Sequence, residues 1–195
     1  MRRPRGADFA PGAFVFPGGV VHAEDSEWGD DIAAAAIREL FEEVGILLAR
    51  TGRRFAQDAD CSRLRELVAG GSTFGEALRA CGLQPALDRL VMLARWVTPA
   101  ALSRRYDARF YVARLPARQT VHVQPDEVTD WVWATPGRAL SDPEIPLVYA
   151  TRKVLESVAG DVDLNSLFRR ARRLESVPIV EPRMVRTESG WTIEH

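Results

Sequence analysis

The pattern of hydrophobic and polar positions along the chain predicts one strong helix. Between Asp31 and Val44, apolar residues recur at intervals of three and four positions, a spacing that places side chains on one helix face. An aspartate at position 30 or 31 is suited to the N-cap, and Gly45 stands where a left-handed residue commonly ends a helix. The predicted apolar face consists of Ala33, Ile37, Leu40, Phe41 and Val44.

Shorter elements surround this helix. The opening, residues 1–19, is rich in Gly and Pro, which predicts a loop that passes through a short strand and reaches a Gly-Gly turn. A polar connector follows at 20–31, and residues 50–85 read as a helical insertion. The pattern predicts helices at 62–69 and 73–81 and within 144–159. It predicts strands at 13–16, 46–49, 90–97, 108–115, 121–123 and 128–134, and a strand-turn-strand around Ser189 within 177–195.

Strands interleaved with helices in mixed order predict an α/β/α layered domain. We place this domain at residues 1–160 and treat 161–195 as a C-terminal extension that packs on it. Such a sheet is expected to begin with an apolar strand before the Gly-rich loop, whereas this chain begins inside the loop. A first strand missing from the chain, through truncation or a misassigned start, would explain the difference.

Composition and charge narrow the classes of function. A net charge of -1 gives no reason to expect a nucleic-acid or membrane partner. No apolar run approaches the ~18 residues of a membrane span, and no apolar stretch follows the first arginines as in a secretory signal. Cys61 and Cys81 lack metal-ligand spacing, so we interpret both as core or surface thiols. The cytoplasm is the predicted compartment.

Three glutamates lie close together on the strong helix. Positions three or four apart share a helix face, so Glu39 shares one with Glu42 and Glu43. Carboxylates gathered in this way repel one another, and a divalent cation would relieve the repulsion. Carboxylate oxygens suit Mg²⁺ or Mn²⁺, and such an ion would neutralise a diphosphate and activate a water for attack. An acidic, solvated helix face is the alternative.

The string Arg-Glu-Leu-Phe-Glu-Glu-Val-Gly-Ile at 38–46 resembles the core of the Nudix box, whose pattern is Arg-Glu-aliphatic-x-Glu-Glu-x-Gly-aliphatic. Gly18 and Gly19 resemble the glycine pair that precedes the box. The resemblance implies a Nudix-type α/β/α sandwich with a mixed sheet, and a hydrolase that acts on phosphorus-containing acid anhydrides. It also implies that Glu39, Glu42 and Glu43 bind Mg²⁺ or Mn²⁺.

The upstream half of the box departs from the family pattern. The family places a glycine, five residues, a glutamate and then seven residues before the arginine. Counting back from Arg38 puts Asp30 at the glutamate position and Glu24 at the glycine position. Asp30 is therefore either an auxiliary metal ligand or only the N-cap. The resemblance implies that Arg38 orients a box glutamate and that Gly45 is structural.

Several strings resemble the coenzyme A diphosphatase branch of the family. The first is Phe-Pro-Gly-Gly-Val at 16–20, followed by Asp25 and Trp28 before the box. The others are Ala-Arg-Trp-Val-Thr-Pro at 94–99 and Arg-Tyr-Asp-Ala-Arg-Phe-Tyr at 105–111. This resemblance implies a coenzyme A or acyl-coenzyme A substrate, cleaved to a 3′,5′-ADP and a 4′-phosphopantetheine product. The terminal Ile-Glu-His is not a peroxisomal signal, and nucleotide sugars, dinucleotides and ADP-ribose stay open as substrates.

The resemblance also implies a further glutamate that faces the box helix. Glu127 is the candidate, as catalytic base or extra ligand beside Glu42 and Glu43, and Asp126 competes with it. A surface turn is the alternative for Glu127.

Arg95 and Arg109, with Arg105, are candidates for contact with phosphate oxygens, together with the glycine pair at 18–19. Surface ion pairs are their alternative. Three tryptophans are open to stacking on adenine or, as half-buried strand residues, to packing in the core: Trp96, Trp131 and Trp133.

A second class of function stays open, a non-catalytic nucleotide-binding module on the Nudix fold. Such modules typically lose box glutamates, whereas this chain keeps all three. The family resemblance also implies a homodimer.

Overall fold

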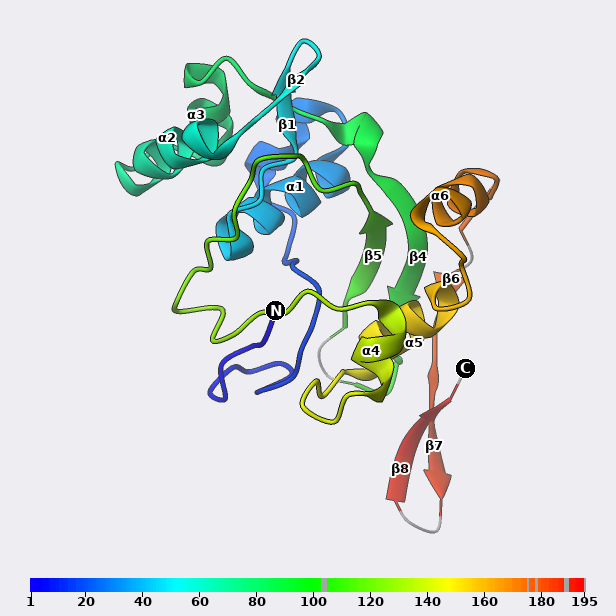
Figure 1. Ribbon diagram of the computed structural model, residues 1–195. Coiled ribbons are helices and arrows are strands. Elements are labelled where there is room, and N and C mark those ends of the chain that lie inside the picture. Colours follow the sequence, from blue (N-terminus) through cyan, green and yellow to red (C-terminus); the bar gives the residue numbers. More distant parts are fainter. Residues whose placement is uncertain (103–104, 175, 178, 188–189, 195) are drawn as a thin grey trace. The chain divides into compact units, whose positions relative to one another are not determined.

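The computed structural model describes residues 1–102, 105–174, 176–177, 179–187 and 190–194 (Figure 1). The chain forms two compact units. Residues 1–90 and 113–133 make up the first unit, and residues 91–112 and 134–195 make up the second. Each unit has a three-stranded sheet of its own, with strand order β2-β1-β3 in the first and β5-β4-β6 in the second.

Helix α1 (Asp31–Val44) of the first unit begins and ends where the sequence predicted. Asp30 caps its first turn by accepting a hydrogen bond of 3.0 Å from the Ala33 N–H. Gly45 ends it with a φ of 73°, and a side chain at this position would come within 2.9 Å of the His122 carbonyl oxygen. The predicted apolar face is buried at Ala33, Ile37, Phe41 and Val44 and partly buried at Leu40.

The helical insertion packs against this apolar face. It contains α2 (Asp58–Ala69) and α3 (Phe74–Ala80), and the Phe41 and Phe74 rings lie 5.9 Å apart. Helix α2 begins earlier than predicted, because Asp60 accepts a hydrogen bond of 2.9 Å from the Gln57 N–H and so supports an additional first turn. Between α1 and α3 the chain also forms a short antiparallel pair, β1 (Ala49–Thr51) and β2 (Arg54–Phe55), and β3 (Gln84–Pro85) pairs with β1.

The predicted strand at 46–49 is wrong at 46–48, where a side chain takes the place of a partner strand, whereas Ala49 begins β1. The Leu47 N–H donates to Gln119 Oε1 over 2.8 Å, and Gln119 Nε2 donates to the Leu47 carbonyl over 2.9 Å. Gln119 Nε2 also donates to the Ala56 carbonyl over 2.7 Å. One amide therefore satisfies the backbone of a buried segment that lies outside any strand.

The predicted strands at 13–16, 121–123 and 128–134 are also wrong. Only isolated bridges join Arg2 to Phe14 and to Asp130, and residues 121–123 are irregular. No strand of the described residues pairs with the segment 128–134, and Trp131 and Trp133 are exposed at 42% and 61%. The interpretation of these two tryptophans as core residues is therefore wrong.

The second unit contains a mixed sheet. Strand β4 (Val91–Val97) pairs antiparallel with β5 (Asp107–Val112) and parallel with β6 (Ile179–Val180). Trp96 of β4 is buried and meets Tyr149 edge-to-face with ring centroids 6.0 Å apart, so its interpretation as a core residue is confirmed.

The helices of this unit are α4 (Pro136–Ser141), α5 (Tyr149–Val158) and α6 (Leu164–Arg172). Only α5 was predicted. The predicted C-terminal strands are present as the antiparallel pair β7 (Arg183–Thr187) and β8 (Gly190–Glu194). The predicted turn residue Ser189 lies outside the described residues. Of the helices in the described part of the chain, none is long and apolar enough to cross a membrane.

The bonds of Gln119 lead to a stability prediction. We expect Gln119→Ala to lower the free energy of unfolding by about 2 kcal/mol or more, because it leaves the buried Leu47 N–H and carbonyl without partners. Urea denaturation would measure the change, and Gln124→Ala, at an exposed position of the same unit, should change stability by less than about 0.5 kcal/mol. Equal losses in the two variants would contradict the role of Gln119.

Candidate functional site

The last two turns of α1 bring the three candidate glutamates together. The side chain of Glu39 is mostly buried, that of Glu42 is 38% exposed, and Glu43 is 2% exposed. Glu43 therefore sits where a carboxylate requires compensation from its neighbours.

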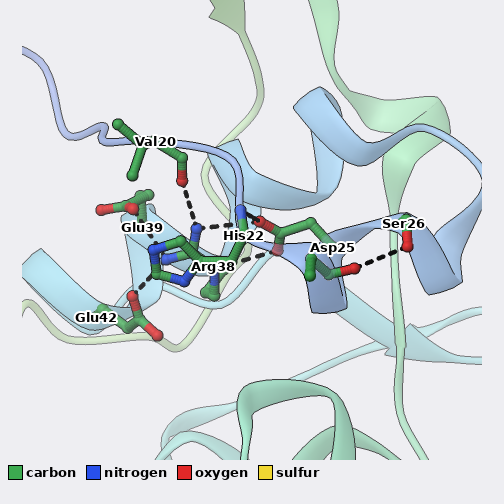
Figure 2. A network of polar contacts seen from close by, with 8 residues as sticks. Val20, His22, Asp25, Ser26, Arg38, Glu39 and Glu42 are labelled. Carbon is green, nitrogen blue, oxygen red and sulfur yellow. Dashed lines mark hydrogen bonds and ion pairs between the residues drawn. The ribbon is translucent and has the colours of Figure 1, made fainter.

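A buried guanidinium connects two of these glutamates (Figure 2). Arg38 Nη1 donates to Glu39 Oε1 and to Glu42 Oε2, each over 2.8 Å. The opposite edge of the guanidinium donates from Nε and Nη2 to the two carboxylate oxygens of Asp25, each over 3.1 Å, and Nη2 also donates to the Val20 carbonyl over 2.8 Å. Burial opposes the charge on Arg38, but its hydrogen bonds to Asp25, Glu39 and Glu42 outweigh burial and raise its pKa.

Asp25 is a site residue that the sequence analysis named only as part of the branch resemblance and to which it gave no role. It is 2% exposed and lies in the 3-10 helix η1 (Ala23–Trp28), and its Oδ2 accepts a hydrogen bond of 2.8 Å from the His22 N–H. It follows Gly19 after five residues, which is the family spacing from glycine to glutamate. Twelve residues rather than seven then separate Asp25 from Arg38, so the insertion lies after the acidic position. Counting back from the arginine therefore selected Asp30, which is the N-cap.

The glycine pair lies against the acidic helix. The Gly18 N–H donates to Glu43 Oε2 over 2.7 Å. A Cβ atom added to Gly19 would lie 2.5 Å from Glu39 Cδ and 2.6 Å from Glu39 Oε2, so the Glu39 carboxylate would have to move. Gly19 therefore lets the backbone approach the Glu39 carboxylate where it stands.

Negative charge is in excess at this end of α1. Burial, together with the charges of Glu39 and Glu127, raises the pKa of Glu43 to about 7, although the hydrogen bond from Gly18 and the charge of Arg3 act in the opposite direction. Burial also raises the pKa of Glu42, although Arg38 acts in the opposite direction. A bound cation would favour the charged form of these carboxylates.

Glu127 is close enough to Glu43 to influence its pKa. Glu127 lies exposed in a turn, where its N–H donates to the Gln124 carbonyl over 3.1 Å. The Gln124 N–H in turn donates to the Glu43 carbonyl over 3.0 Å, which attaches this turn to the end of α1. Asp126 is exposed in the same turn, and the role of Glu127 as base or ligand stays a prediction.

The candidate arginines belong to the second unit. Arg95 of β4 and Arg109 of β5 are cross-strand partners, and Arg95 makes a bidentate ion pair with Asp107, with N–O distances of 2.8 and 2.6 Å. Arg105 pairs with Glu181 over 2.7 Å. Ion pairing, the alternative to phosphate contact, is thus observed for Arg95 and Arg105, and contact of Arg95 and Arg109 with phosphate stays a prediction.

The donor set at the end of α1 fits a hard divalent cation. All of its candidate ligands are carboxylates, one is buried, and carboxylate oxygen is the donor that Mg²⁺ and Mn²⁺ prefer. In the described part of the chain, however, no group of three or more His, Cys, Asp or Glu side chains is placed so that it could hold a metal ion. The reason is visible in the contacts, because Glu39 and Glu42 turn to Arg38 while Glu43 turns to Gly18.

Comparison with known proteins shows the family of the chain. The model of the NUDT19 Nudix domain matches residues 28–145, which is more than half of the chain. The chain therefore belongs to the Nudix hydrolase family, as the box predicted. A crystal structure of a NUDIX hydrolase from Alicyclobacillus acidocaldarius is 25% identical and has a TM-score of 0.73, covering 91% of this chain and 88% of that one. This similarity confirms the predicted Nudix-type α/β fold.

Two curated relatives are similar to the chain over part of their length. Putative nudix hydrolase 7 of Caenorhabditis elegans is 29% identical over 73% of this chain and 48% of the relative. Acyl-coenzyme A diphosphatase NUDT19 of Xenopus laevis is 26% identical over 73% of this chain and 53% of the relative. The chain thus spans about half the length of the curated relatives it matches.

The Arg38 network leads to a second stability prediction. We expect Arg38→Met to lower the free energy of unfolding by about 3–5 kcal/mol, because it leaves the buried Asp25 carboxylate without its cation. A double variant, Arg38→Met with Asp25→Leu, should recover part of this loss, since it removes both charges. Urea denaturation would measure the changes.

The matched control is Arg54→Met, which breaks the exposed ion pair with Asp60. Solvent screens such a pair, so stability should hardly change. Equal losses in the free energy of unfolding for Arg38→Met and Arg54→Met would show that the buried network stabilises the fold no more than an exposed ion pair does.

Proposed function

We propose that the chain is a divalent-metal-dependent pyrophosphohydrolase that cleaves a nucleoside diphosphate linked to another moiety. The observation that carries this proposal is the gathering of Glu39, Glu42 and Glu43 at one end of α1, with Glu43 buried among like charges. Membership of a hydrolase family supports the same reaction class.

Glu39, Glu42 and Glu43 would hold Mg²⁺ or Mn²⁺, which when bound supplies charge neutralisation of the diphosphate and activation of a water. The chain supplies the rest. Arg38 holds Glu39 and Glu42 through one nitrogen, and the Gly18 N–H holds Glu43.

In the proposed hydrolysis, a water oxygen forms a bond to one phosphorus, and the bond from that phosphorus to the bridging oxygen breaks. The departing phosphate keeps the bridging oxygen and its electron pair. The proton of the attacking water passes to a carboxylate, for which Glu127 is our candidate because it is exposed and its charge acts on Glu43.

For the substrate we propose coenzyme A or an acyl-coenzyme A, cleaved to a 3′,5′-ADP and a 4′-phosphopantetheine product. The support comes from relatives, since the matching proteins of Xenopus laevis and Gallus gallus are named acyl-coenzyme A diphosphatases. The match of the NUDT19 domain model to this chain points to the same branch.

A substrate panel tests this choice. Coenzyme A, ADP-ribose, a dinucleotide and a nucleotide sugar would each be incubated with the chain and Mg²⁺ or Mn²⁺, and the products separated by chromatography. We expect the highest kcat/KM for coenzyme A and no turnover with EDTA. Turnover of another diphosphate in preference to coenzyme A would overturn the substrate, and turnover of none would favour the non-catalytic nucleotide-binding module.

Variants of the glutamates test the site. We expect Glu42→Gln and Glu43→Gln to lower kcat on the order of 100-fold, because each removes a charge that would bind the metal. Glu66→Gln, on the exposed face of α2, is the control and should keep full activity. Activity that both Glu42→Gln and Glu43→Gln retain in full would refute the assignment of the metal site.

A further inference from the structure

Two adjacent valines next to the acidic site are exposed. Val20 and Val21 have 58% and 44% of their surface open to solvent, in the loop between the glycine pair and η1. Exposed single apolar residues are ordinary on protein surfaces. Val20 and Val21 differ from other exposed apolar residues because their loop contacts Arg38 and Glu39 of the acidic site.

Three consecutive residues tie this loop to α1. Gly18 donates to Glu43, Gly19 lies against the Glu39 carboxylate, and the Val20 carbonyl accepts from Arg38 over 2.8 Å. Because successive Cα atoms are about 3.8 Å apart, the Val20 Cα lies within about 8 Å of the Glu39 carboxylate. In Figure 2 the Val20 carbonyl points toward Arg38 and its side chain turns away from the guanidinium. The isopropyl group is thus free to meet a ligand.

Such a contact distinguishes between the groups that a diphosphate can carry. In coenzyme A, the CH₂ that follows the second phosphate is attached to a carbon with two methyl groups. In ADP-ribose, the corresponding carbon is C4′ of the ribose, which carries the ring oxygen in place of methyl groups. In nucleotide sugars, the second phosphate is attached directly to the anomeric carbon of a hydroxylated ring. An apolar side chain favours the pantetheine arm, since it removes methyl surface from water, and it offers no hydrogen-bond partner to the oxygens of a sugar.

We propose that Val20 is a specificity-determining residue that contacts the dimethyl carbon of the pantetheine arm, immediately beside the diphosphate. This inference rests on the proposed function. Val20 selects coenzyme A and its thioesters over diphosphates that carry a sugar on the same side, while the acidic helix serves both kinds of substrate.

The substitution Val20→Thr tests the contact with little change of shape, because threonine replaces one methyl with a hydroxyl and keeps the branched Cβ. We expect kcat/KM for coenzyme A to fall on the order of tenfold, mainly through KM, whereas kcat/KM for ADP-ribose stays the same or rises. Val21→Thr, one residue further from Gly19, and Val162→Thr, at a position 96% exposed, are the matched controls and should change neither value.

A binding measurement gives a readout that does not depend on turnover. Saturation-transfer NMR would use 4′-phosphopantetheine, which has no diphosphate to cleave, with the intact chain and Mg²⁺. We expect the strongest transfer at the two methyl groups of the ligand, and a loss of at least about half of it in Val20→Thr. Transfer that is uniform along the ligand, or equal in the wild type and Val20→Thr, would overturn the contact.

The outcomes separate this inference from the proposed function. If the wild type hydrolyses coenzyme A and Val20→Thr changes the preference no more than Val21→Thr does, the assignment of Val20 is wrong and the proposed function stands. If the wild type hydrolyses ADP-ribose but not coenzyme A, the proposed substrate and the role of Val20 are both wrong.

Discussion

The guanidinium of Arg38 is buried, and a buried charge persists only where hydrogen bonds and opposite charges compensate it. Asp25 supplies that compensation from one side, and Glu39 and Glu42 supply it from the other. The same bonds hold the connector before α1 through Asp25 and the acidic last turns of α1 through Glu39 and Glu42. The hydrogen bond from Arg38 to the Val20 carbonyl holds the glycine loop to the same guanidinium. One ion network thus sets where the backbone of the loop meets the carboxylates.

Local patterns in the sequence predicted the parts of the fold that local forces determine. The bounds of α1 follow from its apolar period, the Asp30 cap and Gly45, all within the helix or next to it. The predictions of strands at 46–48 and 121–123 are wrong because strand pairing depends on distant residues. At 46–48, Gln119 satisfies the backbone of Leu47 from 72 positions away, and periodicity carries no sign of such a bond.

The same division holds for the candidate site. The glutamates share one helix, so their spacing predicted that they would gather, and the glycine pair was recognised beside them. Asp25 was given no role because it lies in a connector, within η1, whose length differs from the family pattern. The signal that would have found it is the spacing from Gly19, since the backbone of that glycine is fixed against Glu39. Trp131 and Trp133 alternate as strand residues do, but the pattern does not reveal that no strand covers them.

The central claim is that the buried Arg38 network presents Glu39, Glu42 and Glu43 as ligands for one divalent cation. The most direct test is a crystal structure of the chain grown with Mn²⁺ and measured for anomalous scattering. We predict an anomalous peak about 2.2 Å from oxygens of these glutamates, with Arg38 still bonded to Asp25. A Mn²⁺ peak elsewhere, or none at α1 in crystals saturated with Mn²⁺, would contradict the claim.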